Sequence, residues 1–153
     1  MRVLLIHGPN LNLLGTREPE IYGSATLAEL EDRCRDWASD LGIDIDTHQS
    51  NHEGALIDRI HAAIGVCDAV IINPGALSHY SYALHDAIKA TALPTVEVHL
   101  SDIGAREEWR SRSVTAPACL AVVSGHGPDG YRQALELLAE LGGSAAHQVP
   151  EPL

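Results

Sequence analysis

Length, composition and charge indicate one acidic globular domain. The chain has 153 residues, 45% of them hydrophobic, which suits a single domain with a sizeable core. A formal net charge of −11 disfavours a nucleic-acid-binding surface. The sequence contains no apolar run as long as a membrane span and no signal-peptide pattern at its start. We therefore expect a cytoplasmic protein that binds neither nucleic acid nor membrane.

Two residue types add to this expectation. Cys34, Cys67 and Cys119 are an odd number, widely spaced and without a Cys-x-x-Cys pair, which predicts reduced thiols rather than disulfides or a zinc site. Four of the arginines fall in predicted loops or at a helix start. Guanidinium groups in these places suit a small anionic ligand. The alternative is that these arginines pair with neighbouring glutamates. These arginines are Arg17, Arg106, Arg110 and Arg112.

Apolar periodicity predicts alternating strands and helices along the chain. The first half reads as a strand over 2–7, a helix over 27–41 capped by Thr26, a strand over 43–49 and a helix over 56–64. The second half reads as a strand over 68–72, a helix over 80–91, a strand over 94–98, a short helical stretch over 105–112, a strand over 118–124 and a helix through Leu141.

This alternation is typical of an α/β protein with helices on both faces of a parallel sheet. Five strands in a chain of this size favour a flavodoxin-like three-layer sandwich with strand order 2-1-3-4-5. We expect one catalytic domain over 1–142 and a flexible tail over 143–153.

The predicted strand order places a functional crevice beyond the carboxyl ends of the first and third strands. An unusually long loop, about residues 8–26, follows the first strand. Residues from three loops therefore converge: Asn10, Arg17 and Tyr22 after the first strand, Asn73 and His79 after the third, and Glu97, His99 and Ser101 at the end of the fourth.

The converging side chains suit acid–base chemistry. A tyrosine becomes a general base when a nearby cation lowers its pKa from about 10, and Arg17 lies five residues from Tyr22. Histidines donate protons near neutral pH, and amides such as that of Asn10 stabilise a developing oxyanion. The set suits proton abstraction beside a carbonyl followed by loss of a leaving group. The alternative is a set of hydrogen-bonded loop anchors.

Other chemistries have less support. His79, His85 and Asp86 lack tight metal-ligand spacing, and neither a P-loop nor a dinucleotide-binding glycine motif is present. Ser124 lies outside a G-x-S-x-G motif, and Lys89 falls late in a predicted helix, which disfavours a serine hydrolase and a Schiff base. We expect no metal and no cofactor.

The spaced motifs resemble those of type II 3-dehydroquinate dehydratases from about Val3 to Leu141. The matching segments are His7-Gly-Pro-Asn-Leu-Asn-Leu-Leu-Gly-x-Arg-Glu-Pro-x-x-Tyr-Gly23, Gln49-Ser-Asn-His-Glu-Gly54, Ile72-Asn-Pro-Gly-Ala76 with His79, Glu97-Val-His-Leu-Ser101, Ala105-Arg-Glu-Glu-Trp-Arg110 and Gly125-x-Gly-x-x-Gly-Tyr131.

The resemblance implies a flavodoxin-like lyase that dehydrates 3-dehydroquinate to 3-dehydroshikimate by anti elimination through an enolate, in the shikimate pathway or in quinate breakdown. It also implies a dodecamer of four trimers and a lid over 11–19. In the chemistry that the resemblance implies, Tyr22 is the base, with its pKa lowered by Arg17, and Asn10 holds a water that stabilises the enolate. His99 is the acid and is oriented by Glu97. The resemblance also implies that the backbone of Leu100 and Ser101 binds the substrate carboxylate, that the ring hydroxyls are bound by Asn73, His79 and Arg110, and that Asp86 reaches a neighbouring subunit's site.

The sequence departs from the family pattern near His79, and two alternatives to the implied activity stay open. Leu77, Ser78, Tyr80 and His85 are unusual, and so is the segment 114–119. The first alternative is a related lyase for a different cyclic hydroxy acid. The second is a binding or scaffolding oligomer without turnover, which the intact acid–base set disfavours.

Overall fold

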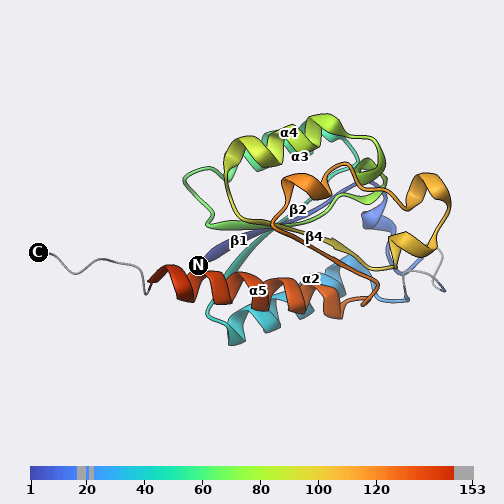
Figure 1. Cartoon of the computed structure of the whole chain (residues 1–153). Helices are drawn as coiled ribbons and strands as arrows, with labels where there is room; N and C mark the ends of the chain where they lie inside the picture. Colours follow the sequence, from blue (N-terminus) through green and yellow to red (C-terminus); the bar gives the residue numbers. More distant parts are fainter. Residues whose placement is uncertain (17–19, 21–22, 147–153) are drawn as a thin grey trace, which may run out of the picture.

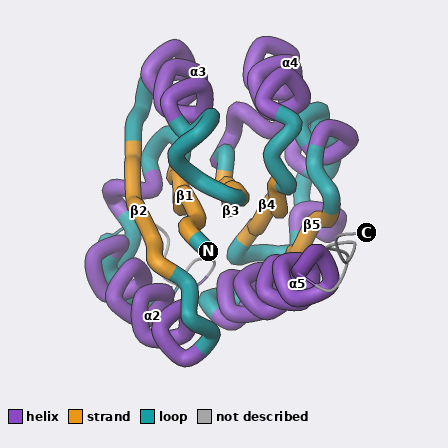
Figure 2. The backbone as a smooth tube through the Cα atoms, turned by 90° about the vertical axis from the view of Figure 1, so that its left-hand side faces the viewer, coloured by secondary structure: helices purple, strands orange, loops and turns teal. Residues whose placement is uncertain are grey.

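A parallel sheet lies between two pairs of helices (Figures 1 and 2). The computed structural model describes residues 1–16, 20 and 23–146, and in this part of the chain the strand order is β2-β1-β3-β4-β5. This order confirms the predicted α/β architecture. The strands are β1 (Arg2–His7), β2 (Asp44–Gln49), β3 (Ala69–Asn73), β4 (Thr95–His99) and β5 (Ala121–Ser124). The helices are α2 (Leu27–Asp40) and α5 (Asp129–Ala146) on one face, and α3 (Glu53–Ala62) and α4 (Tyr82–Thr91) on the other.

Strand β1 shows why the sheet is covered on both faces. Its residues from Val3 onward are buried, and successive side chains of a strand point to opposite faces. Val3 and Leu5 pack into the core beneath α2 and α5, whereas Leu4 and Ile6 pack into the core beneath α3 and α4. A strand that is apolar on both faces must lie inside a three-layer structure.

Several element boundaries differ from the sequence-based prediction. The segment 105–112 is not a regular helix, because it buries no apolar face; it forms the 3-10 turns η3 (Ile103–Ala105) and η4 (Glu108–Arg110). The last strand begins at Ala121 rather than at residue 118, since Pro117, which cannot donate to a sheet, lies in the turn η5 (Ala116–Ala118). Helix α3 begins earlier than predicted, at Glu53.

Helix α5 continues past its predicted end at Leu141 to Ala146. A glycine in a helix costs only about 1 kcal/mol relative to alanine, so Gly142 does not stop it. Residues 147–153 of the predicted tail lie outside the described residues. No helix in the part of the chain that the structure describes is both long and apolar enough to cross a membrane.

The carboxyl ends of β1 and β3 approach each other closely, and Gly8 permits this. The backbone N–H of Gly8 donates a 2.8 Å hydrogen bond to the carbonyl of Asn73. A Cβ atom at position 8 would collide with the backbone carbonyl of Pro74. The loops that follow the two strands are therefore held side by side.

We predict that Gly8→Ala destabilises the protein by about 1–3 kcal/mol, because backbone atoms must move to accept the new methyl group. Thermal unfolding followed by circular dichroism measures the change. Gly54→Ala is the matched control: Gly54 lies in α3 with no atom within 4 Å of an added Cβ, so this variant should gain up to about 1 kcal/mol. Equal melting temperatures for Gly8→Ala and the wild type would contradict the close approach.

Candidate active site

A cleft opens where the loops after β1, β3 and β4 meet. Figure 1 shows the segments that follow these strands at the end of the sheet opposite the amino terminus. Seven predicted site residues line the cleft: Asn10, Asn73, His79, His99, Leu100, Ser101 and Arg110. The structure therefore brings these seven residues from distant parts of the sequence together in one cleft. Arg106, one of the four arginines that the sequence analysis considered for an anionic ligand, also lines the cleft.

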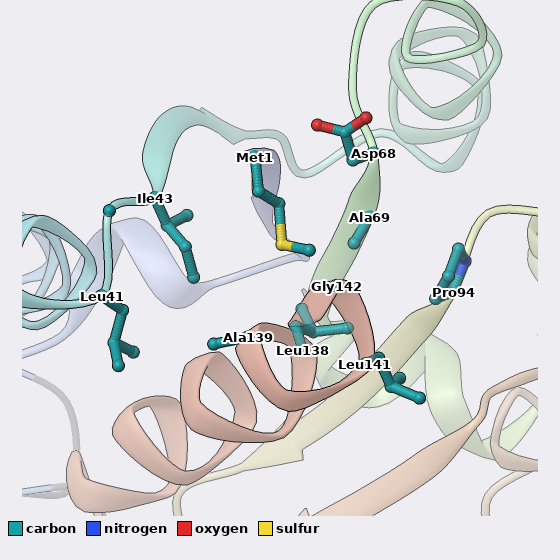
Figure 3. Close-up of a pocket in the computed structure, with 11 residues that line it drawn as sticks. Met1, Leu41, Ile43, Asp68, Ala69, Pro94, Leu138, Ala139, Leu141 and Gly142 are labelled. Atoms are coloured by element: carbon teal, nitrogen blue, oxygen red, sulfur yellow. The ribbon is translucent and has the colours of Figure 1, made fainter. Parts of the chain in front are cut away.

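A second hollow lies at the amino ends of the strands (Figure 3). Its lining is mainly apolar and includes Met1, Ile43, Pro94 and Leu138. The carboxylate of Asp68, which also lines it, already accepts a 2.7 Å hydrogen bond from the backbone N–H of Arg2. This hollow lacks the converging histidines and arginines of the first cleft, so we assign the chemistry to the carboxyl ends of the strands.

Asn10 is held in an uncommon backbone conformation at the mouth of the cleft. Its φ is 69°, in the left-handed region, which asparagine tolerates better than most residues. Its backbone N–H donates to Oδ1 of Asn51 over 2.9 Å, and Nε2 of Gln49 donates to the same oxygen over 3.1 Å. The polar loop after β2 thus fixes the start of the loop after β1.

Asn73 forms the floor of the cleft at the end of β3. Its Oδ1 accepts a hydrogen bond from the N–H of Gly75 over 3.1 Å, and its Nδ2 donates to the hydroxyl of Tyr131 over 3.2 Å. Tyr131 is fully buried in α5, and burial raises the pKa of its phenol well above the usual range. The phenol therefore stays protonated, and one N–H of the Asn73 amide is left for a ligand.

His99 and Glu97 form a buried pair on β4. Nε2 of His99 lies 2.8 Å from Oε2 of Glu97, and Glu97 is 0% exposed. Ser113 Oγ donates to the same carboxylate oxygen over 2.7 Å, and Thr115 Oγ1 donates to the other oxygen. Burial raises the pKa of Glu97, but the hydrogen bonds from His99, Thr115 and Ser113 outweigh burial and hold the pKa below its ordinary value. Glu97 is therefore ionised at neutral pH.

His79 is oriented by the chain that follows η4. Its Nδ1 donates to the carbonyl of Arg112 over 2.7 Å, since a carbonyl can only accept. In the neutral ring this bond leaves Nε2 as an acceptor. The ring of Trp109 meets His79 edge-on, with centroids 5.5 Å apart, and the Arg110 guanidinium lies 4.0 Å from the centroid of the Trp109 ring. These contacts give the cleft one wall that is aromatic and cationic.

The remaining predicted residues lie elsewhere. Tyr22 and Arg17 fall outside the described residues, so their predicted roles stay predictions. Asp86 is exposed on α4 and is not among the residues that line the cleft of its own chain. Ser113 and Thr115, which hold Glu97, carry no sequence signal, because they lie in a segment without periodicity.

Comparison with known proteins gives a consistent family assignment. The family model "Dehydroquinase class II" matches residues 1–139. The chain is 55% identical over 141 residues to a 3-dehydroquinate dehydratase of Desulforudis audaxviator, covering 92% of this chain and 94% of that protein. It is 56% identical over 140 residues to the Thermus thermophilus 3-dehydroquinate dehydratase, covering 90% and 93%. A crystal structure of type II dehydroquinase from Butyrivibrio crossotus superimposes with a TM-score of 0.88 at 43% identity, covering 90% of this chain and 97% of that one.

The lowered pKa of Glu97 predicts a loss of stability in acid. In the unfolded chain this carboxyl has its ordinary pKa of 4.5. Its contribution is therefore present above that pH and is lost as the pH falls through the lower pKa of the folded state. We expect Glu97→Gln to have a free energy of unfolding that falls less steeply than that of the wild type below about pH 5.

Urea unfolding at a series of pH values measures these slopes. Glu140→Gln is the matched control, because Glu140 is exposed on α5, and it should keep the wild-type slope. The assignment of Glu97 as a buried, stabilised anion is contradicted if Glu97→Gln and the wild type lose stability in parallel.

Proposed function

The chain belongs to the class II dehydroquinase family, and from this membership we propose that it dehydrates 3-dehydroquinate to 3-dehydroshikimate. The protein is then a carbon–oxygen lyase. The observation that carries the proposal is the meeting of His99, Asn10 and Asn73 in one cleft, over a buried carboxylate that touches His99. This arrangement places a proton donor and amides beside a small polar ligand.

The reaction needs one proton removed and one delivered. We propose that Tyr22, with its pKa lowered by Arg17, takes the proton from C2, which leaves an enolate. Asn10 holds the water that stabilises the negative oxygen. The electron pair then forms the ring double bond as the C1–oxygen bond breaks. A proton from His99 converts the departing hydroxyl into water.

The position of His99 suits the role of acid. It is 6% exposed, it lines the cleft, and its Nε2 is occupied by Glu97, so Nδ1 is the nitrogen left to donate to the substrate. Glu97 therefore orients the acid through this contact and does not itself line the cleft.

The remaining residues would bind the substrate. We assign the carboxylate to the backbone N–H groups of Leu100 and Ser101, and the ring hydroxyls to Asn73, His79 and Arg110. All five residues line the cleft. The loop over 11–19 would close over the bound substrate. The catalytic domain would include the whole of α5, to Ala146, rather than end at residue 142. The chemistry would need no metal and no cofactor.

We further propose that the protein is a cytoplasmic dodecamer of four trimers. The unpaired cysteine pattern supports the location. Asp86 is consistent with the trimer, because it is exposed on α4, where a neighbouring subunit can be reached. In this assembly Asp86 would complete the neighbour's site.

The proposed base is tested with Tyr22→Phe. We expect the variant to lose at least about 100-fold in kcat, because only proton transfer is removed, while KM changes little. The assay follows the ultraviolet absorption of the conjugated enone in the product. Tyr82→Phe is the control, since it removes an exposed phenol of α4 and should keep wild-type turnover.

The same assay tests the function as a whole. Wild-type turnover should survive both a chelator and borohydride treatment in the presence of substrate, as expected for a lyase with neither a metal nor a Schiff base. Full turnover in Tyr22→Phe would exclude Tyr22 as the base. An absence of enone at any wild-type concentration, with substrate still bound, would favour a binding protein or another cyclic hydroxy acid.

The assembly is tested by light scattering coupled to gel filtration. We expect a mass of twelve times the 16.4 kDa chain. A mass of one chain would exclude both the dodecamer and the role of Asp86 in a neighbouring site.

A further inference from the structure

The segment 112–116 is bound by His79, which lines the cleft, and by His85 of α4. The carbonyl of Arg112 accepts from His79, and the carbonyl of Val114 accepts from Nδ1 of His85, each over 2.7 Å. The N–H of Val114 donates to the carbonyl of Ser78 over 2.6 Å. The backbone of alternate residues is thus fixed to η2 (Gly75–His79) and α4.

The residues between them, Ser113 and Thr115, bind Glu97 instead. Their hydroxyls reach both oxygens of its carboxylate, and they lie 3.1 Å from each other. Ser113 Oγ also accepts from the N–H of Ala116 over 3.0 Å, which orients the hydroxyl toward Glu97. Thr115 is fully buried, so its hydroxyl has no water to compete for it. Among the residues that the structure describes, Glu97 therefore has three side-chain partners, of which only His99 can carry charge.

Other titratable groups nearby do not neutralise the negative charge of Glu97. Cys119 packs against Thr115, with Sγ 3.5 Å from its carbonyl; burial, and then the charge of Glu97, raises the pKa of this thiol to about 12, so it stays neutral. His79, Arg106 and Arg110 line the cleft, and the groups that hold the pKa of Glu97 low are His99, Thr115 and Ser113 instead. The hydroxyls of Ser113 and Thr115 are the neutral donors that face the carboxylate itself.

We propose that Ser113 and Thr115 are positioning residues that set the acid strength of the His99–Glu97 pair. By donating to Glu97 they stabilise the carboxylate both before and after His99 gives up its proton. The stabilisation is larger after the proton has left, because the carboxylate then has no imidazolium partner. The two hydroxyls therefore keep the shared proton on His99 and make the pair a stronger acid. This inference rests on the proposed role of His99 as the acid.

The test separates this role from a structural one by the direction of a pH shift. Without one hydroxyl, the pair should hold its proton more tightly. In Thr115→Val and in Ser113→Ala we expect the midpoint of the pair's titration to rise by about one pH unit, and the alkaline limb of the kcat profile to move with it. Glu97→Gln removes the anion and should move the midpoint in the opposite direction. Misplacement of His99 alone would lower kcat without raising either midpoint.

The midpoint is measured by NMR on protein labelled at histidine Cε1, and kcat by the enone assay. Thr115→Ser retains the hydroxyl and should restore wild-type values. Thr91→Val is the matched control, because the Thr91 hydroxyl donates to the carbonyl of Ile88 and not to Glu97. Ser113 is only half-buried, so Ser113→Ala keeps the test available if Thr115→Val does not fold.

Two outcomes are decisive in different ways. An NMR midpoint that is unchanged or lower in both variants overturns the inference. A raised NMR midpoint with an unmoved kcat profile supports the role of the hydroxyls, but it shows that His99 is not the acid, so the proposed mechanism fails separately.

Discussion

The burial of the Glu97 carboxylate is the constraint on which the rest of the site depends. Removal of one partner of a buried ion pair typically costs about 3–5 kcal/mol, so a carboxylate with no water access needs partners for both of its oxygens. β4 itself supplies only His99. The other donors come from the long connection between β4 and β5, which runs back over the end of the sheet. The path of residues 113–115 therefore serves to satisfy this carboxylate.

The second buried polar group, Asn73, is held in a comparable way from the other side of the sheet. Its partner Tyr131 comes from α5, so a helix behind the sheet contributes to the floor of the cleft. A site that uses a tyrosine as base must keep other phenols out of the chemistry. Burial raises the pKa of Tyr131, which leaves this phenol protonated, and the task of accepting a proton then falls to Tyr22 in the proposed mechanism.

Much of this arrangement was predictable from the sequence, because it follows from topology. Apolar strands that alternate with helices along the chain predict a parallel sheet. The loops that follow its strands meet at the carboxyl ends of neighbouring strands. That rule alone predicts that three residues of the cleft lie together, namely Asn10, Asn73 and His99. The donors to Glu97 were not predictable, since Ser113 and Thr115 lie in a segment whose path is set by hydrogen bonds to His79 and His85 rather than by periodicity. The turns η3 and η4 escape prediction for another reason: they bury no residue and so lack the apolar face on which a helix prediction depends.

The neutrality of the donors to Glu97 matters for acid catalysis. A lysine or arginine in the place of Thr115 would also stabilise the carboxylate, but its charge would repel the imidazolium form of His99 and discharge the acid before substrate arrives. A purely apolar surrounding would raise the pKa of Glu97 until the carboxylate captured the proton itself. Hydroxyl groups avoid both effects, because they stabilise the anion without opposing the cation. Glu97 can then stay ionised beside His99, which in the proposed mechanism releases its proton to the departing hydroxyl.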